Sequence, residues 1–598
     1  MKTDLAFLRQ FGRLFRQNWA NYLFLLLGIN FMLEAVVIPL LTFLTSRILA
    51  AGQIPYVSYT NLGEILIHHP FASLALLLEL VLLIGLVYFQ FSFLLLGIVN
   101  ISHGEFTLKT TFKQATQRLT KLNLASLGFL GGYFVLIMPF ANLIFKTPLL
   151  SKVTIPAFIV DFLLNNPLFA CLLGLFYLGI FYLGLRLLLT LPLMIIKQVP
   201  TNQAVLTSWN LTKKHNLTTL RRMFIITICV GLVTALGYMV AILLQVAFDN
   251  LAAPYNLLTA ILLLALLQFW ATLSATFVSF LLLQLVLSQA KLTHPTTIKD
   301  TGKHRLKLKL TTSILLGLMV ASSLVNNYFY LHDNTKAPLR ISHRGVDNGN
   351  GVQNTLPALA KTTKLHPDFV EMDLHETKDH QFVVMHDENL KNLTGVNKAP
   401  HQLTLKQLTK LTARENGHQA KIVSFDDYLA AANKYHQKLL IEIKTTKFDS
   451  PKLVTNFLAK YQTTIKQHHH QIHSLDYRVV AQIKKQAPTL FVSYILPYNF
   501  AYPNTNANAY SMEESTLNES FIINAYLRHQ RVYAWTVNTE TDINKALWLN
   551  VDGIITDNLS TLDSTIAEFY QHPSYADKML NYLLILPYDN NIASEASA

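Results

Sequence analysis

The sequence predicts two domains of different kinds: an α-helical polytopic membrane domain comes first, and a globular domain follows it. Of the 598 residues, 51% are hydrophobic and only 14% are charged, so the chain is too long and too apolar for one soluble domain. Long apolar runs continue to about residue 331, whereas polar and apolar residues mix from residue 332 onward, as in a globular domain.

Seven apolar runs each exceed the roughly 20 residues that a helix needs to cross a hydrocarbon core. They lie near residues 21–46, 72–99, 124–145, 167–196, 223–247, 256–289 and 311–331. The first run is too long for a cleaved signal peptide, so we expect it to be retained. The predicted domains are therefore a membrane domain of about seven transmembrane helices (1–331), a tether (332–338), a globular domain (339–570) and a C-terminal tail (571–598) that packs on the globular domain or on the membrane.

Lysine and arginine are distributed unevenly between the connections of the membrane domain. The segments 1–20, 101–123, 197–222 and 291–310 hold 19 of these residues, whereas the alternate connections hold three. This asymmetry predicts a cytoplasmic N-terminus, and seven crossings then place the globular domain outside the cytoplasm. The positive excess belongs to the membrane domain, which disfavours nucleic acid as a partner.

Two cytoplasmic segments mix basic and apolar residues at helical spacing, Leu5–Arg16 and Phe106–Leu122. Each is predicted to lie in the membrane surface and attract anionic lipid; a short basic connector is the alternative. Within the predicted spans, Glu34, Glu79 and Arg186 are the clearest ionisable residues. Because an unpaired charge inside a membrane is costly, we expect Arg186 to pair with a carboxylate there. A path for lipid or substrate is the alternative explanation.

A pair of carboxylates marks the first candidate site in the globular domain. In the predicted strand Phe369–Leu374, residues two apart point to one face, so Glu371 and Asp373 point together. Paired oxygen ligands favour a hard cation, Ca²⁺ or Mg²⁺, over zinc. Two solvated acids on an exposed strand are the alternative.

Two histidines and an arginine lie at the ends of neighbouring predicted strands. His343 follows the predicted strand 339–342, and His386 follows the predicted strand 382–385. Two imidazoles that titrate near neutrality suit a general acid and a general base, and the planar fork of Arg344 suits a phosphate. A single histidine in such a position is more often structural, but the combination with the carboxylate pair favours catalysis.

These residues belong to a set of motifs, in register from about 339 to 570, that resembles the glycerophosphodiester phosphodiesterases. The motifs are His343-Arg344-Gly345, Asn354-Thr355, Glu371-x-Asp373, Thr377-Lys378-Asp379, His386-Asp387, Glu442-x-Lys444, Ala534-Trp535-Thr536-Val537-Asn538 and the run 551–557. The resemblance implies a (β/α)8 TIM barrel with its site at the C-terminal ends of the strands. It further implies Glu442 as the third metal carboxylate, Lys444 as a phosphate contact and Trp535 as a pocket wall near the glycerol.

Three positions raise questions of their own. The family commonly has Glu-Asn-Thr where this chain has Gln353-Asn354-Thr355, which leaves open how Arg344 is held. The histidines at 468–470 and His473 could indicate a transition-metal site, but we expect a solvated loop. Asp557 is expected to cap a helix or organise a loop.

The predicted reaction is metal-assisted hydrolysis of a glycerophosphodiester to sn-glycerol 3-phosphate and an alcohol, by an enzyme anchored in the cell membrane. Glycerophospho-alcohols, lysophospholipids and glycerophosphate polymers are candidate substrates. Two alternatives remain open: a transporter or lipid-handling protein whose barrel only binds glycerophosphate groups, and a catalytically silent scaffold.

Overall fold

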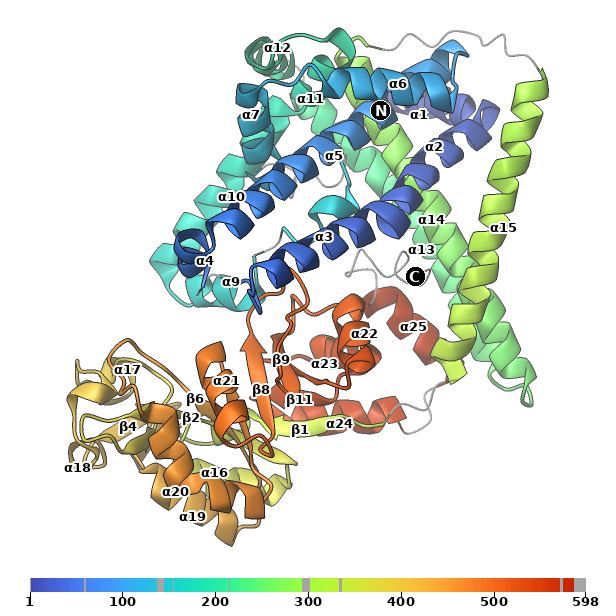
Figure 1. The fold of residues 1–598 in the computed structure, drawn as a ribbon. Helices are drawn as coiled ribbons and strands as arrows, with labels where there is room; N and C mark the ends of the chain where they lie inside the picture. The colour runs from blue at the N-terminus through green and yellow to red at the C-terminus, as the bar shows by residue number, and fades with distance from the viewer. Residues whose placement is uncertain are drawn as a thin grey trace. The chain divides into compact units, whose positions relative to one another are not determined.

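The computed structural model describes residues 2–58, 61–136, 145–153, 155–213, 216–292, 302–332, 336–570 and 574–585. The chain divides into two compact units. The helical unit consists of Met1–Gln53, Gly63–Asp333 and Ser574–Ala598, and the barrel unit consists of Ile54–Leu62 and Asn334–Pro573. Figure 1 shows long helices in the first unit and a mixture of strands and shorter helices in the second. The expected fold class, an α-helical membrane domain followed by a (β/α)8 barrel, is confirmed.

The helical unit is built from long apolar helices. Its elements are α1 (Lys2–Gln17), α2 (Trp19–Met32), η1 (Leu33–Val37), α3 (Ile38–Ala51), α4 (Leu62–His68), α5 (Pro70–His103), α6 (Leu108–Leu119), α7 (Leu124–Leu136), η2 (Pro148–Leu150), α9 (Ala157–Leu164), α10 (Pro167–Leu187), α11 (Thr190–Pro192), η3 (Leu193–Lys197), α12 (Thr201–Lys213), α13 (Asn216–Phe248), α14 (Tyr255–Gln289), α15 (Gly302–His332) and α25 (Tyr575–Ile585).

Six of the described helices are long and apolar enough to cross a membrane, with 27 to 35 residues each. They are Trp19–Ala51, Pro70–His103, Pro167–Lys197, Asn216–Phe248, Tyr255–Gln289 and Leu306–His332. A seventh candidate is the pair α6 and α7, bent by 106° at the break between them. The third predicted span, 124–145, begins with α7, and its residues 137–144 lie outside the described part of the chain.

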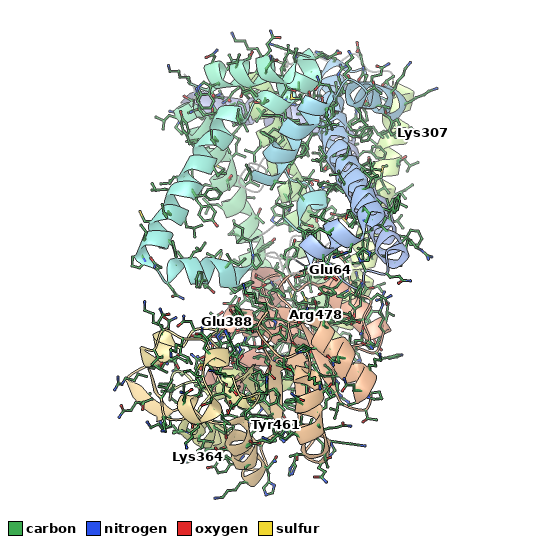
Figure 2. All side chains as sticks on the ribbon, turned by 60° about the vertical axis from the view of Figure 1, so that its left-hand side comes forward. Glu64, Lys307, Lys364, Glu388, Tyr461 and Arg478 are labelled. Atoms are coloured by element: carbon green, nitrogen blue, oxygen red, sulfur yellow. The ribbon has the colours of Figure 1, made fainter. Side chains whose placement is uncertain are left out.

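Large apolar side chains on these helices are exposed, as at Leu178, Leu232 and Leu262, and Figure 2 draws the side chains that project from the ribbon. Such a surface suits lipid, in which a helix satisfies its own backbone groups. The expected pairing of Arg186 with a carboxylate is wrong for the described residues. Its Nη2 atom donates instead to the carbonyl of Trp209 at 2.6 Å, and its guanidinium lies 4.5 Å from the Trp209 ring centroid.

Two segments belong to a different unit from their neighbours in the chain. The connection Ile54–Leu62, between the first two candidate spans, groups with the barrel unit. In that unit the Asn504 backbone NH donates to Pro55 O at 2.8 Å, and the Tyr56 ring lies 5.4 Å from Tyr477 and 5.2 Å from Tyr494. Helix α25 of the tail packs in the helical unit, where Met579 and Leu583 join a cluster with residues of α13 and α14.

The barrel is closed by eight parallel strands. Their order is β1-β11-β10-β9-β8-β7-β6-β2, and β1 also pairs with β2, which joins the two ends of the sheet. The strands are β1 (Leu339–Ser342), β2 (Phe369–Glu376), β6 (Leu439–Ile443), β7 (Gln471–Ser474), β8 (Val492–Leu496), β9 (Ala509–Glu513), β10 (Arg531–Trp535) and β11 (Gly553–Thr556). The short strand β3 (Phe382–Val384) adds to β2 in the antiparallel direction, and β4 (Thr412–Glu415) and β5 (His418–Lys421) form a separate hairpin.

Helices follow the strands and cover the barrel. The main ones are α16 (Leu356–Thr362), α19 (Phe425–Lys434), α20 (Leu453–Gln467), α21 (Tyr477–Gln486), α22 (Glu519–Leu527), α23 (Glu540–Trp548) and α24 (Leu559–Tyr570). Shorter elements are η4 (His343–Gly345), η5 (Thr363–Leu365), α17 (Lys391–Thr394), η6 (Pro400–Gln402) and α18 (Leu405–Leu408).

Strand alternation explains why the interior changes from apolar to polar along the barrel. An apolar interior cluster contains Ile341, Phe369, Leu440 and Tyr533, each from a different strand. Because side chains two residues apart share a face, the next inward positions toward the C-terminal ends of these strands are His343, Glu371, Glu442 and Trp535. The polar residues of the candidate site therefore lie on an apolar floor, at the end of the barrel where such sites occur.

Candidate active site

The carboxylates of the site are buried and compensated by cations and amides. Glu371 and Asp373 are 2% and 1% exposed. Glu371 Oε2 accepts from the Arg344 backbone NH at 2.8 Å, and Asp373 Oδ2 accepts from Asn354 Nδ2 at 2.8 Å. The Lys444 ammonium lies 3.3 Å from Asp373 Oδ1 and 2.9 Å from Glu442 Oε1. These are not the solvated acids of the alternative interpretation.

The electrostatics of Asp373 and Lys444 reinforce each other. Burial opposes ionisation of Asp373, but Lys444, His386 and Arg344 hold its pKa well below the usual range. Burial likewise opposes the charge of Lys444, yet Glu442 and Asp373 raise the pKa of its ammonium above the ordinary value. Both groups are therefore charged at neutral pH, and together they hold a fixed charge pattern at the mouth of the barrel.

Each of the two predicted catalytic histidines carries an aspartate on its Nδ1 atom. His343 Nδ1 lies 2.7 Å from Asp557 Oδ1, and His386 Nδ1 lies 2.9 Å from Asp387 Oδ1. A carboxylate at Nδ1 fixes the ring orientation and leaves Nε2 for proton transfer. Asp557 was expected to organise a loop, and its backbone and its contact with Asn538 do so. Its carboxylate has a second role that was not expected, because it also orients His343.

The aspartate at His343 changes its protonation. Burial and Arg344 lower the pKa of His343, but Asp557 and Glu371 outweigh them and raise it above the ordinary value. Burial opposes the charge of Asp557, and His343 with Asn538 lowers its pKa to about 2. The pair therefore favours an imidazolium beside a carboxylate.

A tight turn presents Arg344. Its φ is 52° and that of Gly345 is 66°, both in the left-handed region. A Cβ on Gly345 would lie 2.7 Å from the Tyr428 hydroxyl, so only glycine fits behind the arginine. The Arg344 Nε atom is buried without a hydrogen-bond partner among the described residues, 3.9 Å from Asp373 Oδ2.

Gln353 links Arg344 to a carboxylate on the β4–β5 hairpin. Arg344 Nη1 donates to Gln353 Oε1 at 2.8 Å, and Gln353 Nε2 donates to Glu415 Oε1 at 2.5 Å. The Gln353 backbone NH also donates to Glu415 Oε2 at 2.9 Å. The negative charge that the family pattern has at position 353 is therefore present one residue further from the arginine, on Glu415. The sequence did not predict this relay.

The histidine-rich stretch 468–473 is not a solvated loop throughout. His468 and His469 are exposed, but His470 and His473 are buried. His470 accepts from the Leu439 backbone NH at 2.9 Å and contacts Asn433 Oδ1, and burial with His468 and His469 lowers its pKa to about 4. The expectation is wrong for these two residues because β7 begins at Gln471 and turns His473 into the barrel.

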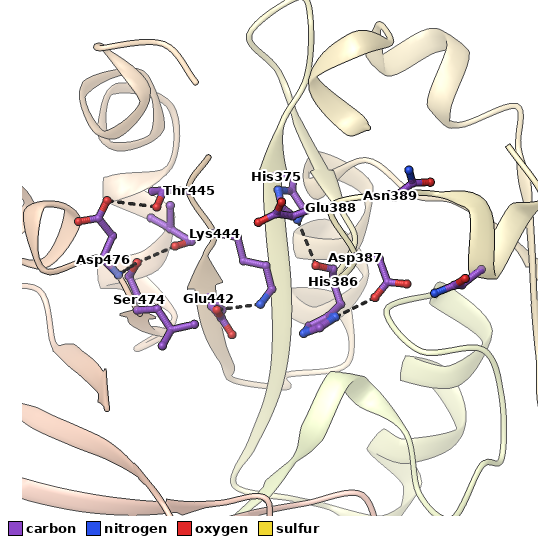
Figure 3. Close-up of a pocket in the computed structure, with 13 residues that line it drawn as sticks. His375, His386, Asp387, Glu388, Asn389, Glu442, Lys444, Thr445, Ser474 and Asp476 are labelled. Atoms are coloured by element: carbon purple, nitrogen blue, oxygen red, sulfur yellow. Dashed lines mark hydrogen bonds and ion pairs between the residues drawn. The ribbon is translucent and has the colours of Figure 1, made fainter. Parts of the chain in front are cut away.

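A cavity of ≈ 350 Å³ opens beside these groups (Figure 3). His386, Glu442 and Lys444 line it, whereas His343, Arg344, Glu371, Asp373 and Trp535 are not among its lining residues. In Figure 3, His386 points toward Asp387 and Lys444 toward Glu442. Trp535 donates from Nε1 to the Ser511 carbonyl at 2.8 Å. Because Trp535 does not line this cavity, its expected place beside the glycerol of a substrate stays a prediction.

Three side chains could hold a metal ion. Ligand atoms of Glu371, Glu442 and His473 all lie within 4.8 Å of one another. Asp373, which the sequence also predicted as a metal ligand, is engaged by Lys444 and Asn354. The assignment of Glu371, Asp373 and Glu442 as metal ligands stays a prediction. His473 was missed, although its spacing from Gln471 at the start of a strand is a signal for an inward side chain.

The comparisons with known proteins cover both units. Residues 8–325 match the model of the membrane domain of glycerophosphoryl diester phosphodiesterase, and residues 343–561 match that of the glycerophosphoryl diester phosphodiesterase family. A glycerophosphodiester phosphodiesterase of Caldanaerobacter subterraneus is 27% identical over 237 residues, covering 38% of this chain and 96% of the relative. A lysophospholipase D of Homo sapiens is 45% identical over 89 residues, covering 14% of this chain and 28% of the relative.

A solved phosphodiesterase of Oleispira antarctica, in complex with the product sn-glycerol-3-phosphate, is 20% identical. The match covers 38% of this chain and 96% of that chain, with a TM-score of 0.34.

Proposed function

Because the chain belongs to the glycerophosphodiester phosphodiesterase family, with the membrane domain as well as the catalytic domain, we propose that it hydrolyses glycerophosphodiesters to sn-glycerol 3-phosphate and an alcohol with the help of a divalent cation. The observation that carries the proposal is the pair of histidines, each oriented by an aspartate, beside a buried cluster of carboxylates and cations.

The charged groups have separate tasks in this reaction. The Nε atom of Arg344 has no hydrogen-bond partner among the described residues. It and the ammonium of Lys444 are suited to a phosphate oxygen. Glu371, Asp373 and Glu442 would hold the divalent cation, which supplies charge neutralisation at the phosphate when it is bound. The raised pKa of His343 favours its protonated form, so we assign it the general acid, and His386 the general base.

The test measures release of glycerol phosphate by purified full-length protein from a panel of glycerophospho-alcohols, lysophospholipids and glycerophosphate polymers, with Mg²⁺, Ca²⁺ or Mn²⁺ added in turn. We expect turnover of at least one substrate that stops with a chelator and returns with the metal. A folded protein that binds these compounds without turning any of them over would support the transporter or lipid-handling alternative and contradict the proposal.

We further propose that the barrel faces away from the cytoplasm. The Ile54–Leu62 connection packs within the barrel unit, so both lie on one side of a membrane. An even number of crossings must then separate residue 62 from residue 334. Five of the candidate spans lie between them, and the bent pair α6–α7 supplies a sixth. With the first span this gives seven, and the lysine and arginine asymmetry places the N-terminus inside.

Labelling of intact cells with a membrane-impermeant maleimide tests this orientation. In a background with Cys171→Ser and Cys229→Ser, we expect the exposed barrel variant Lys364→Cys to react in intact cells. The matched variant Lys213→Cys, an exposed position in the segment 197–222 that is predicted to be cytoplasmic, should react only after permeabilisation. The reverse pattern, or equal reaction of both in intact cells, would overturn the proposed orientation.

A further inference from the structure

A buried histidine on β7 faces the active-site carboxylates, and its inward nitrogen has no hydrogen-bond partner among the described residues. The His473 side chain is 4% exposed, and its Nε2 atom lies 3.5 Å from Glu371 Oε1. The proposed hydrolysis gives His473 no task, although its ring lies against one of the proposed metal carboxylates.

Strand register brings His473 to this position. His473 is the register partner of Glu442 on β6, and Glu442 is the partner of Asp373 on β2. Other contacts use the opposite oxygen of Glu371, since Oε2 accepts from the Arg344 backbone NH. The oxygen that remains, Oε1, is the one that faces His473.

The contact between His473 Nε2 and Glu371 Oε1 is best explained by a cation bound between the two side chains. His473 Nδ1 lies 3.5 Å from the Ser511 hydroxyl, which is itself 2.9 Å from Ser493. With the ring proton on Nδ1, the lone pair of Nε2 faces a carboxylate oxygen, and two acceptors repel each other. Both contacts of the ring are longer than an ordinary hydrogen bond of about 2.7–3.2 Å, so a proton on Nε2 would bridge the distance to Glu371 poorly, and the contact with Ser511 holds Nδ1 only weakly. Two ligands of one metal ion, each about 2.1 Å from it, are up to about 4.2 Å apart, a range that includes the observed separation.

We propose that His473 ligates, through Nε2, the same divalent cation as Glu371 and Glu442. The resulting mixed set of nitrogen and oxygen ligands favours Mn²⁺ or another transition-metal ion over Ca²⁺, which prefers oxygen ligands alone. The inference rests on the proposed function for the presence of a cation in this site, and it adds a ligand that the Glu371, Asp373 and Glu442 set lacks. It also reverses the preference for a hard ion that the carboxylate pair alone suggested.

Pulsed electron paramagnetic resonance on the full-length protein, loaded with one equivalent of Mn²⁺, tests the ligation directly. We expect a nitrogen coupling from one imidazole, which disappears in His473→Gln. The matched variants His343→Gln and His386→Gln should keep the coupling, since neither ring is in the proposed ligand set. Bound Mn²⁺ without nitrogen coupling, or a coupling that persists in His473→Gln, would overturn the proposal.

Competition between Mn²⁺ and Ca²⁺ gives a second measurement. His473→Gln should lower the affinity for Mn²⁺ by about tenfold or more and the affinity for Ca²⁺ by less than about threefold. Equal losses for both ions would mean that the substitution only disturbs the site, and the preference for Mn²⁺ would be wrong. If His473→Gln does not fold, His473→Asn replaces it, and the spectrum of the unchanged protein still decides the ligation.

The two proposals can fail separately. Hydrolysis of a glycerophosphodiester by a protein whose Mn²⁺ lacks nitrogen coupling overturns the His473 assignment and leaves the proposed function standing. Nitrogen coupling in a folded protein that releases no glycerol phosphate supports the His473 assignment and overturns the proposed function.

Discussion

The two sides of the active site orient their histidines in the same way but depend on different parts of the chain. Asp387, the partner of His386, is the next residue, whereas Asp557, the partner of His343, is 214 positions away on the far side of the β1–β11 seam. The His386 side is therefore set by local chain geometry. The His343 side exists only once the last strand has closed the barrel, so its chemistry depends on the whole fold.

Replacement of the histidines should give the largest effects, and it tests whether both sides take part in catalysis. We expect His343→Ala and His386→Ala each to lower kcat by about 10²–10⁴-fold, the range for loss of a general acid or base, with KM changed much less. Steady-state release of glycerol phosphate measures both constants. His468→Ala, an exposed histidine outside the site, is the matched control and should keep full activity. Full activity of His343→Ala or His386→Ala would mean that the substituted histidine takes no part in catalysis.

Replacement of the aspartates should give smaller effects and separate the two sides. Asp557 raises the pKa of His343, so Asp557→Asn should lower that pKa. With His343 as the acid, its protonated form is then lost at lower pH, and the alkaline limb of the pH–rate curve moves to lower pH. We expect kcat at neutral pH to fall by roughly tenfold or more.

Asp387→Asn is the matched variant on the other side, and it should leave the alkaline limb in place. An acidic limb that moves in Asp557→Asn, with an unchanged alkaline limb, would show instead that His343 is the base.

The Gln353–Glu415 relay should have the smallest effect, because it acts on Arg344 through one intervening amide. Glu415→Gln removes the charge but keeps the size, and we expect KM to rise a few-fold with little change in kcat, because the half-buried carboxylate acts on Arg344 only through Gln353. The double variant Gln353→Glu with Glu415→Gln moves the carboxylate next to Arg344 and should restore KM. A double variant no better than Glu415→Gln would mean that the carboxylate does not act on Arg344.

The sequence predicted what depends on local pattern. Alternation along 369–374 was enough to pair Glu371 with Asp373, and the apolar runs were enough to find the candidate spans. Contacts between distant strands could not be found in this way, because the partner of His343 depends on closure of the barrel and the partner of Gln353 on the fold of a hairpin. His473 is an intermediate case: the sequence predicted the strand 471–474, but the neighbouring His468 and His469 favoured a solvated histidine cluster, so the inward direction of His473 was not inferred.

The return of α25 to the helical unit has a consequence for proteolysis. In that unit the Ala576 backbone NH donates to Asp249 Oδ2 at 3.0 Å, and Lys578 donates to Leu331 O at 3.1 Å. The barrel segment Asn334–Pro573 is thus joined to the helical unit at both its N-terminal and its C-terminal end. A single cut within 333–335 would leave the barrel attached through its C-terminal end, so shedding of a free enzyme requires cleavage on both sides of the barrel.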